Sequence, residues 1–167
     1  RYVLTGTPIA ETPLGRNSCR VVLSAAHVVA DPFTAQDPSG PAAVDWKATM
    51  AFRRHLFGLG LGIAEAMDTA QRGMGLDWPG ALELIRRTKS ELPDAVVFNG
   101  AGTDQLDAGD ARSLDDVRRA YFEQVEAIQK VGGRIILMAS RALARVAKGP
   151  DDYAAVYRDV LARCDDK

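Results

Sequence analysis

Short apolar runs alternate with amphipathic segments along most of the chain. Four of these runs are rich in valine, isoleucine and leucine, which is typical of parallel strands buried on both faces. They predict strands at residues 20–26, 62–66, 95–98 and 134–138. A polar loop and a segment with apolar residues at helical spacing follow each strand. Strands that alternate with helices predict an α/β fold with right-handed crossovers.

Capping residues mark where the predicted helices begin. Asp45, Asp77 and Ser113 each stand before an amphipathic segment, at the position of an N-cap. Ser113 and Asp116 have the spacing of a capping box, with aspartate in place of the usual glutamate. A last helix is expected to follow Pro150. The aromatic residues of this last helix are expected in the core.

The spacing of the units, roughly 35–40 residues, fits either an open doubly wound sheet or a (β/α) barrel. A full barrel has eight units and about 250 residues, so four units would make half of one. A half barrel leaves two edge strands exposed. In that case we expect a fragment of a longer protein or a homo-oligomer that covers the edges. Residues 1–19 are expected to form an N-terminal extension or a hairpin.

Composition narrows the class of protein. The 167 residues are 47% hydrophobic and 26% charged, with a formal net charge of −1. This balance gives no electrostatic reason to expect nucleic acid or a membrane surface as partner. No apolar stretch reaches the roughly 18 residues of a membrane helix, and the first residues lack a signal-peptide core, so a cytoplasmic protein is expected. Cys19 and Cys164 form no CxxC pair, which predicts reduced thiols rather than a disulfide or metal site.

Polar residues follow the carboxyl end of each predicted strand, where both kinds of α/β fold bind ligands. These residues are the candidates for a functional site. They are His27, Asp31, Glu65, Asp68, Thr69, Asn99, Thr103, Asp104, Gln105, Ser140 and Arg141.

Several candidates also have a structural interpretation. A carboxylate inside a buried strand, such as Glu65, must be paired or functional, and an ion pair with Arg72 or Arg141 is the structural alternative. His27 could be a buried histidine that contacts a backbone carbonyl. Residues 68–69 could cap the turn that follows them. Arg141, near a strand end, is well suited to hold a carboxylate in a bidentate pair.

The glycines of "NGAGTDQ" do not predict a dinucleotide site. The dinucleotide fingerprint requires a third glycine where Gln105 stands, and it belongs to the first βα unit rather than the third. An acidic run, "LDAGDARSLDD", follows the loop and would repel a pyrophosphate. We therefore expect no cofactor.

Four segments carry a family resemblance: "AAHVVADP", "GLGIAEAMDTAQRGMGLDWP", "GAGTDQ" and "ILMASRALARVAKGPDDYAAVY". With them the chain resembles the N-terminal half of a family of uncharacterised proteins (domain of unknown function 993) that is related to dihydrodipicolinate synthase and N-acetylneuraminate lyase. The resemblance implies a TIM barrel of which residues 1–167 form the first four βα units, as one domain or fragment.

The related lyases form a Schiff base between a lysine and a 2-keto acid. Their Gly-Thr-Thr-Gly-Glu loop, which holds the substrate carboxylate, corresponds to "MDTAQ" at residues 67–71, where only Thr69 is kept. An aspartate at position 68 would prefer hydroxyls or a metal to an anion. Their Gly-Thr-Gly-Ala-Asn turn after strand three resembles "NGAGTDQ". The Schiff-base lysine and the catalytic tyrosine are expected beyond Lys167, since they lie on later strands.

The leading hypothesis is therefore a carbon–carbon lyase or aldolase-like enzyme acting on a small oxo acid or a sugar-derived substrate. Its expected substrate-binding residues are Glu65, Asp68, Thr69, Asn99, Thr103 and Arg141.

Two alternatives remain open from the sequence. In a metal-dependent sugar isomerase or aldolase, His27, Glu65 and Asp104 would hold a divalent metal. A non-catalytic half barrel would instead associate through its strand edges.

Overall fold

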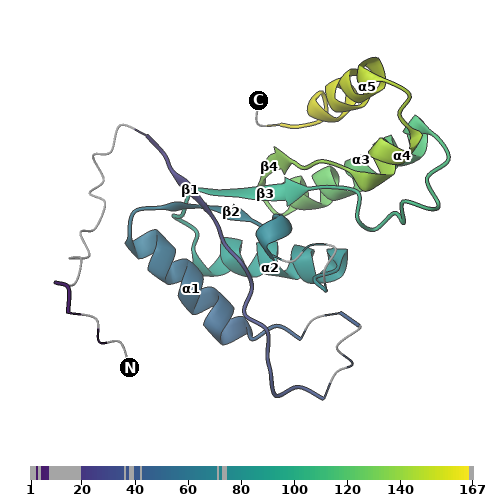
Figure 1. Cartoon of the computed structure of the whole chain (residues 1–167). Coiled ribbons are helices and arrows are strands. Elements are labelled where there is room, and N and C mark those ends of the chain that lie inside the picture. The colour runs from purple at the N-terminus through teal and green to yellow at the C-terminus, as the bar shows by residue number, and fades with distance from the viewer. Residues whose placement is uncertain are drawn as a thin grey trace.

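Four parallel strands alternate with helices in one sheet (Figure 1). The computed structural model describes residues 3, 5–7, 20–35, 37, 40–41, 43–70, 72 and 75–165. The elements are β1 (Leu23–Ala25), α1 (Trp46–Gly58), β2 (Gly62–Glu65), a 3-10 helix (Asp68–Ala70), α2 (Trp78–Glu91), β3 (Val97–Ala101), α3 (Leu114–Lys130), β4 (Arg134–Leu137), α4 (Arg141–Val146) and α5 (Pro150–Leu161).

The strands lie in the order β1-β2-β3-β4, so each is hydrogen-bonded to its neighbour in sequence. Register places Glu65 beside Asn99, and Asn99 beside Ile135, with their side chains on one face. Glu65 contacts α1 and α2, and Ile135 packs against the core to which α3 contributes. Helices α1, α2 and α3 therefore cover the same face of the sheet. A doubly wound sheet would reverse its strand order and carry helices on both faces, so this arrangement is consistent with a half barrel.

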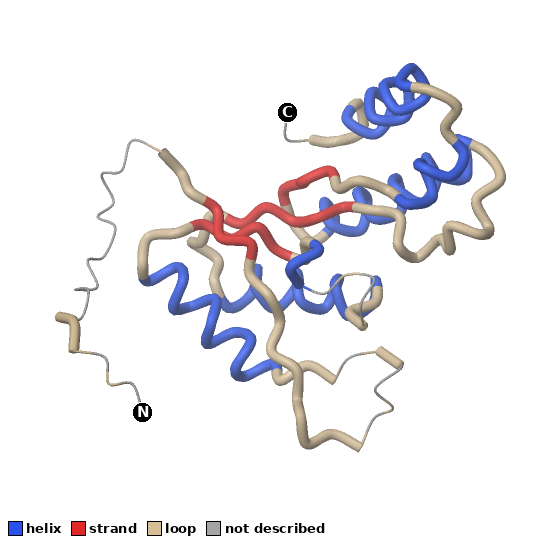
Figure 2. Tube along the Cα trace, in the orientation of Figure 1, coloured by secondary structure: helices blue, strands red, loops and turns tan. Residues whose placement is uncertain are grey.

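The hydrophobic core lies between the sheet and its helices. The larger cluster is built mainly from α2, α3 and α5, and the smaller one joins Leu56 of α1 to Ile63 of β2. Helix α5 packs on the outer side of α3, where Tyr121 and Tyr157 meet edge to face with ring centroids 6.4 Å apart. In Figure 2, α1 and α2 lie together on one side of the strands.

The predicted helix starts are confirmed. The Asp45 side chain accepts from the Ala48 N–H, and the Asp77 side chain accepts from the Gly80 N–H, each at 2.9 Å. Ser113 and Asp116 form the reciprocal capping box, and the last helix begins at Pro150.

Strand three differs most from its prediction. The sequence predicted residues 95–98, whereas β3 spans Val97–Ala101 and so includes Asn99 and Gly100. A Cβ atom on Gly100 would lie 2.6 Å from the Ala66 carbonyl oxygen and 2.8 Å from the Met138 sulfur. The glycine therefore permits close packing between neighbouring segments, and does not mark the start of the loop.

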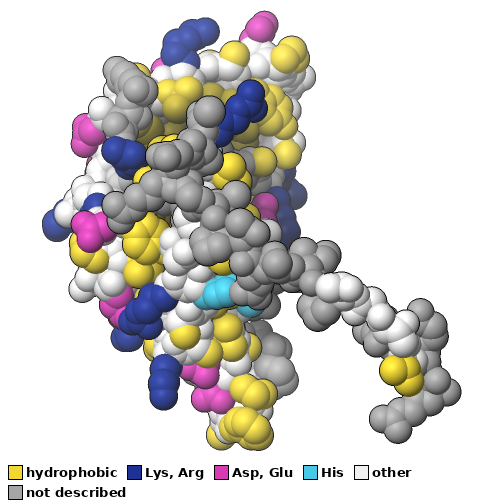
Figure 3. Space-filling view, turned by 90° about the vertical axis from the view of Figure 1, so that its left-hand side faces the viewer, with side chains coloured by type: hydrophobic (Ala, Val, Ile, Leu, Met, Phe, Trp, Pro, Cys, Tyr) yellow, Lys and Arg dark blue, Asp and Glu magenta, His cyan; other side chains and the backbone are white. Residues whose placement is uncertain are grey.

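Other boundaries differ less. β1 is only three residues long, against a prediction of 20–26, and the short helix α4 was not predicted. The predicted N-terminal hairpin lies almost entirely outside the described residues. Among the described helices, none combines the length and apolar character needed to cross a membrane. Acidic and basic side chains are interspersed with hydrophobic ones on the face shown in Figure 3.

Candidate functional site

A cavity of about 330 Å³ opens beyond the carboxyl ends of β2, β3 and β4. Segments that follow all three strands line it. The lining residues are Asp68, Arg72, Gly102, Thr103, Asp104, Leu106, Asp107, Ala108, Met138, Ala139, Ser140, Arg141 and Ala142. Of the residues predicted from the sequence, it therefore brings together Asp68, Thr103, Asp104, Ser140 and Arg141.

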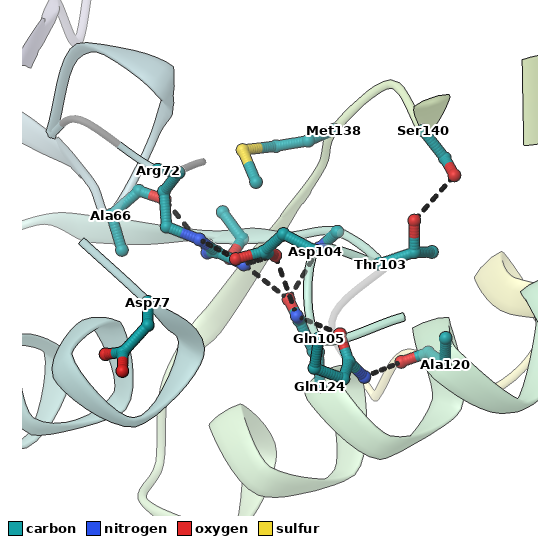
Figure 4. Close-up of polar contacts among 12 residues, drawn as sticks. Ala66, Arg72, Asp77, Thr103, Asp104, Gln105, Ala120, Gln124, Met138 and Ser140 are labelled. Carbon is teal, nitrogen blue, oxygen red and sulfur yellow. Dashed lines mark hydrogen bonds and ion pairs between the residues drawn. The ribbon is translucent and has the colours of Figure 1, made fainter. Parts of the chain in front are cut away.

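Arg72 forms the base of the cavity and uses all five of its N–H groups (Figure 4). Nη1 donates to the carbonyl oxygens of Ala66 and Gly100, at 3.1 and 2.9 Å. Nε and Nη2 form a bidentate pair with the Asp104 carboxylate, and Nη2 also donates to Gln124 Oε1. Because a guanidinium has five donors, Arg72 has none left for a ligand. It is a positioning residue that ties the ends of β2 and β3 together.

The Ala66 carbonyl that Arg72 holds belongs to a strained residue. Ala66 has a φ of 52°, in the left-handed region that a residue with a Cβ rarely adopts. Such strain persists where surrounding contacts fix the backbone. Here Arg72 Nη1 provides one of those contacts. The left-handed conformation of Ala66 turns the chain sharply from β2 into the segment that carries Asp68.

Gln124 extends the network from inside helix α3. Its Oε1 accepts from the Gly102 N–H at 2.7 Å, and its Nε2 donates to Asp104 Oδ1 and to Gln105 Oε1. Gln105 Nε2 in turn donates to the Ala120 carbonyl. This fully buried glutamine was not predicted, although a polar residue within the apolar stripe that contains Tyr121 and Val125 is a usable signal.

The Asp104 carboxylate is held in its charged form. Partial burial opposes ionisation, but hydrogen bonds and charge from Arg72, together with the Gln124 amide, keep the pKa of Asp104 below its usual value. An anionic Asp104 neutralises Arg72. The Arg72–Asp104 pair therefore holds the segments around the cavity in place and contributes no net charge to it.

Replacing Asp104 with asparagine is expected to lower the free energy of unfolding at pH 7 by about 1.5–3 kcal/mol, the range for hydrogen bonds to charged groups. The folded-state pKa of Asp104 lies below the unfolded value of about 3.9. Its contribution is therefore present above that unfolded value and is lost as pH falls through the folded-state pKa. Urea unfolding at pH 7 and at pH 3 should show a smaller difference between the two proteins in acid. Asp110→Asn, at an exposed aspartate, is the control; a pH-independent difference for Asp104→Asn would contradict the account.

A pair of buried hydroxyls forms one wall of the cavity. Thr103 Oγ1 and Ser140 Oγ lie 2.6 Å apart, and Ser140 Oγ also accepts from the Leu143 N–H as the N-cap of α4. Next to this pair, the Tyr121 hydroxyl donates to the Met138 carbonyl at 2.6 Å, and burial raises the pKa of Tyr121. The wall is thus rigid, polar and uncharged.

Unpaired charges lie at the mouth of the cavity. Asp68, Asp107 and Arg141 are exposed, and none of the three has an ion-pair partner among the described residues. Arg141 is the first residue of α4, beside the Ser140 cap. A guanidinium in this position can bind a carboxylate in a bidentate pair. A free carboxylate such as Asp68 accepts from hydroxyl or ammonium groups.

Glu65 lies elsewhere, on the helix-facing side of β2. Its carboxylate accepts from Arg53 at 2.6 and 2.5 Å, from the Thr88 hydroxyl at 2.5 Å and from the Ala66 N–H at 3.0 Å. Both members of the ion pair are fully buried. The partner is therefore Arg53 of α1, and the predicted partners Arg72 and Arg141 are wrong. The sequence could not identify Arg53 because it lies on a neighbouring helix.

Asn99 and Thr69 are also absent from the cavity lining. Asn99 shares the helix-facing side of the sheet with Glu65, and its Nδ2 donates to the Arg134 carbonyl at 2.9 Å. Thr69 is exposed within the 3-10 helix. Asn99 lies outside the cavity because β3 extends through residue 101, so that Asn99 is a strand residue and not a loop residue.

The structure does not bring together the three predicted metal ligands. His27 is exposed and stacks on Phe52 with ring centroids 4.6 Å apart, while Glu65 and Asp104 are each bound by an arginine. His27 contacts the Val28 carbonyl, as the structural interpretation expected, but it is not buried. Within the described part of the chain, no three His, Cys, Asp or Glu side chains are grouped so as to hold a metal ion.

Comparison with known proteins identifies the family. The sequence model described as "Protein of unknown function (DUF993)" matches residues 1–167, so the chain belongs to this family. No match is found among curated proteins.

Proposed function

We propose that this member of the DUF993 family is part of an aldolase-like carbon–carbon lyase that acts on a small oxo acid or a sugar-derived compound. The cavity at the carboxyl ends of β2, β3 and β4 would form half of its active site. The observation that carries the proposal is the arrangement of charges at the cavity. One unpaired arginine, Arg141, and two unpaired aspartates, Asp68 and Asp107, line a cavity whose Arg72–Asp104 base is neutral and hydrogen-bonded.

This arrangement favours one orientation of the substrate. Arg141 would bind the substrate carboxylate, and Asp68 would accept from a hydroxyl at the other end of the molecule. The Thr103–Ser140 hydroxyl pair would contact the polar groups between them. The Arg72–Asp104 pair would act as the rigid base, because its groups are already bound to each other.

The sheet supports the barrel that the lyase proposal requires. In a (β/α)8 barrel the helices cover the outside, and the opposite face of the strands packs in the interior. Phe98 and Ile136 project to that opposite face, are half-buried, and belong to neither core cluster. Four further strands would cover them, either from the same protein or from a second copy in a homo-oligomer.

The Schiff-base lysine would come from outside the described residues. Lys47, Lys89 and Lys130 lie on helices, and Lys148 lies between α4 and α5. None of the four is on a strand. Lys167 lies outside the described residues. The part played by this chain in the proposed reaction is therefore to bind and orient the substrate.

Replacing Arg141 with methionine is expected to weaken binding of a 2-oxo acid by about tenfold or more, because a charge-assisted hydrogen bond contributes about 1.5–3 kcal/mol. Isothermal titration of the full-length protein with pyruvate would measure the change. Arg145→Met is the matched control, since Arg145 is exposed on the same short helix but does not line the cavity. Equal affinities for the two variants would argue against carboxylate binding by Arg141.

Borohydride reduction tests the lyase chemistry itself. A Schiff base between a lysine and a keto substrate should be reduced to a secondary amine and appear as a mass increase on one peptide of the full-length protein. Absence of an adduct with every substrate that the enzyme cleaves would refute the Schiff-base mechanism.

A further inference from the structure

A second cavity, of about 280 Å³, lies at the opposite end of the sheet from the proposed active site. It is formed where α2 leads into β3 and where α3 leads into β4. The lining residues are Ile85, Lys89, Pro93, Asp94, Ala95, Val96, Val97, Asn99, Gly132, Gly133 and Arg134.

One buried polar atom in this cavity has no partner. Asn99 is 2% exposed, and its Nδ2 donates to the Arg134 carbonyl. Its Oδ1 is the single buried side-chain oxygen or nitrogen without a hydrogen-bond partner in the described part of the chain. Exchanging the two amide atoms would place an oxygen against the Arg134 carbonyl, so the assignment follows from the contact. An unsatisfied buried acceptor costs about 1–3 kcal/mol. Because Oδ1 is itself buried, a donor in the cavity would remove this cost once the amide turns toward it.

The surrounding backbone fits closely around Asn99. A Cβ atom on Gly133 would lie 2.8 Å from Asn99 Nδ2. The α3–β4 turn can therefore lie this close to the side-chain amide only because residue 133 is glycine. At the rim, Lys89 lies across the same turn, with its Cε 3.7 Å from the position of a Cβ on Gly132. Lys89 is exposed and has no ion-pair partner among the described residues. The cavity therefore joins an unmet acceptor inside to an unpaired cation at its rim.

We propose that this cavity is a second ligand site, which binds a small anion that also carries a hydroxyl group. The hydroxyl would donate to Asn99 Oδ1, and the carboxylate or phosphate would pair with the Lys89 ammonium. The site is distinct from the proposed active site, because the two cavities lie at opposite ends of the strands. A molecule bound here would brace the α2–β3 and α3–β4 turns against each other.

The test is isothermal titration of the full-length protein with glycerate and with glycerol 3-phosphate, which supply the two possible anionic groups. At least one should bind, and Lys89→Met should weaken it about tenfold. Lys47→Met, which removes an exposed lysine of α1 far from the cavity, should leave the affinity unchanged, as should Arg141→Met. Sulfate and glycerol should each bind at least about tenfold more weakly, since sulfate has no hydroxyl group and glycerol has no charge.

Asn99→Leu, which removes the acceptor, should abolish the preference for the hydroxylated anion over the simple one. If this variant fails to fold, the Lys89 comparison still decides the question. The proposal is overturned if neither hydroxylated anion binds, if sulfate binds equally well, or if Lys89→Met has no effect. Weakening by Arg141→Met would also overturn it, because the anion would then occupy the cavity at the carboxyl ends.

Discussion

Replacing Arg53 with methionine is expected to lower the free energy of unfolding by about 3–5 kcal/mol. Arg53 is fully buried and forms two short hydrogen bonds with the Glu65 carboxylate. It also donates to the carbonyl oxygens of His27 and Thr49, at 3.0 and 3.1 Å. Methionine fills much of the same space but leaves a buried carboxylate without a countercharge. Urea unfolding would measure the loss.

Arg54→Met is the matched control for this prediction. Arg54 is the next residue of α1 and pairs with Glu91, but its side chain is 52% exposed. A surface pair of this kind contributes about 0–1 kcal/mol. The double variant Arg53→Met with Glu65→Leu should recover much of the loss, because it removes the unpaired charge. Equal effects of Arg53→Met and Arg54→Met would contradict a structural role for the buried pair.

Replacing Arg72 with lysine is expected to lower the free energy of unfolding by about 3 kcal/mol and to weaken ligand binding at the strand-end cavity, although the charge is kept. Lysine has three donors on a single nitrogen. It cannot reach Asp104, Gln124 and the two carbonyl oxygens at once. Freed from Arg72, the strained Ala66 and the segment that carries Asp68 should lose their fixed positions. Urea unfolding and pyruvate titration would measure the two effects.

Arg87→Lys is the control for Arg72→Lys. Each arginine lies over a tryptophan ring and pairs with a carboxylate, but Arg87 is 41% exposed and pairs with Glu83 of its own helix. We expect a change of about 0.5 kcal/mol or less for Arg87→Lys. If Arg72→Lys retained both stability and affinity, a positive charge at this position would be enough, and the five hydrogen-bond donors of the guanidinium would not be needed.

Local sequence signals predicted the architecture because they depend on neighbouring residues. The caps at Asp45, Asp77 and Ser113 each bond a backbone N–H three residues ahead, so sequence spacing alone identifies them. The strand at 97–101 was misplaced for the opposite reason. Gly100 resembles a loop residue in sequence, and its packing against Ala66 and Met138 depends on contacts from other units.

The residues of the candidate site also fall into two groups, those that local sequence could predict and those that it could not. Residues that follow the strands closely in sequence, such as Asp68 and Arg141, could be assigned to the cavity mouth from the fold class alone. Residues whose role depends on a distant partner could not. Gln124 reaches Gly102 across 22 positions, and Glu65 is bound by an arginine 12 positions earlier on a helix. Glu65 was predicted to bind substrate, with a buried ion pair only as the alternative, and local sequence could not select the partner of that pair.

A crystal structure of the full-length protein with a bound 2-oxo acid such as pyruvate would show directly whether the strand-end cavity binds substrate. We expect the ligand beyond the carboxyl ends of β2, β3 and β4, with its carboxylate on the Arg141 guanidinium and its remaining oxygen near the Thr103–Ser140 pair. Arg72 should stay bound to Asp104 when the ligand is present. A ligand found elsewhere, or one that displaces Asp104 from Arg72, would contradict this expectation.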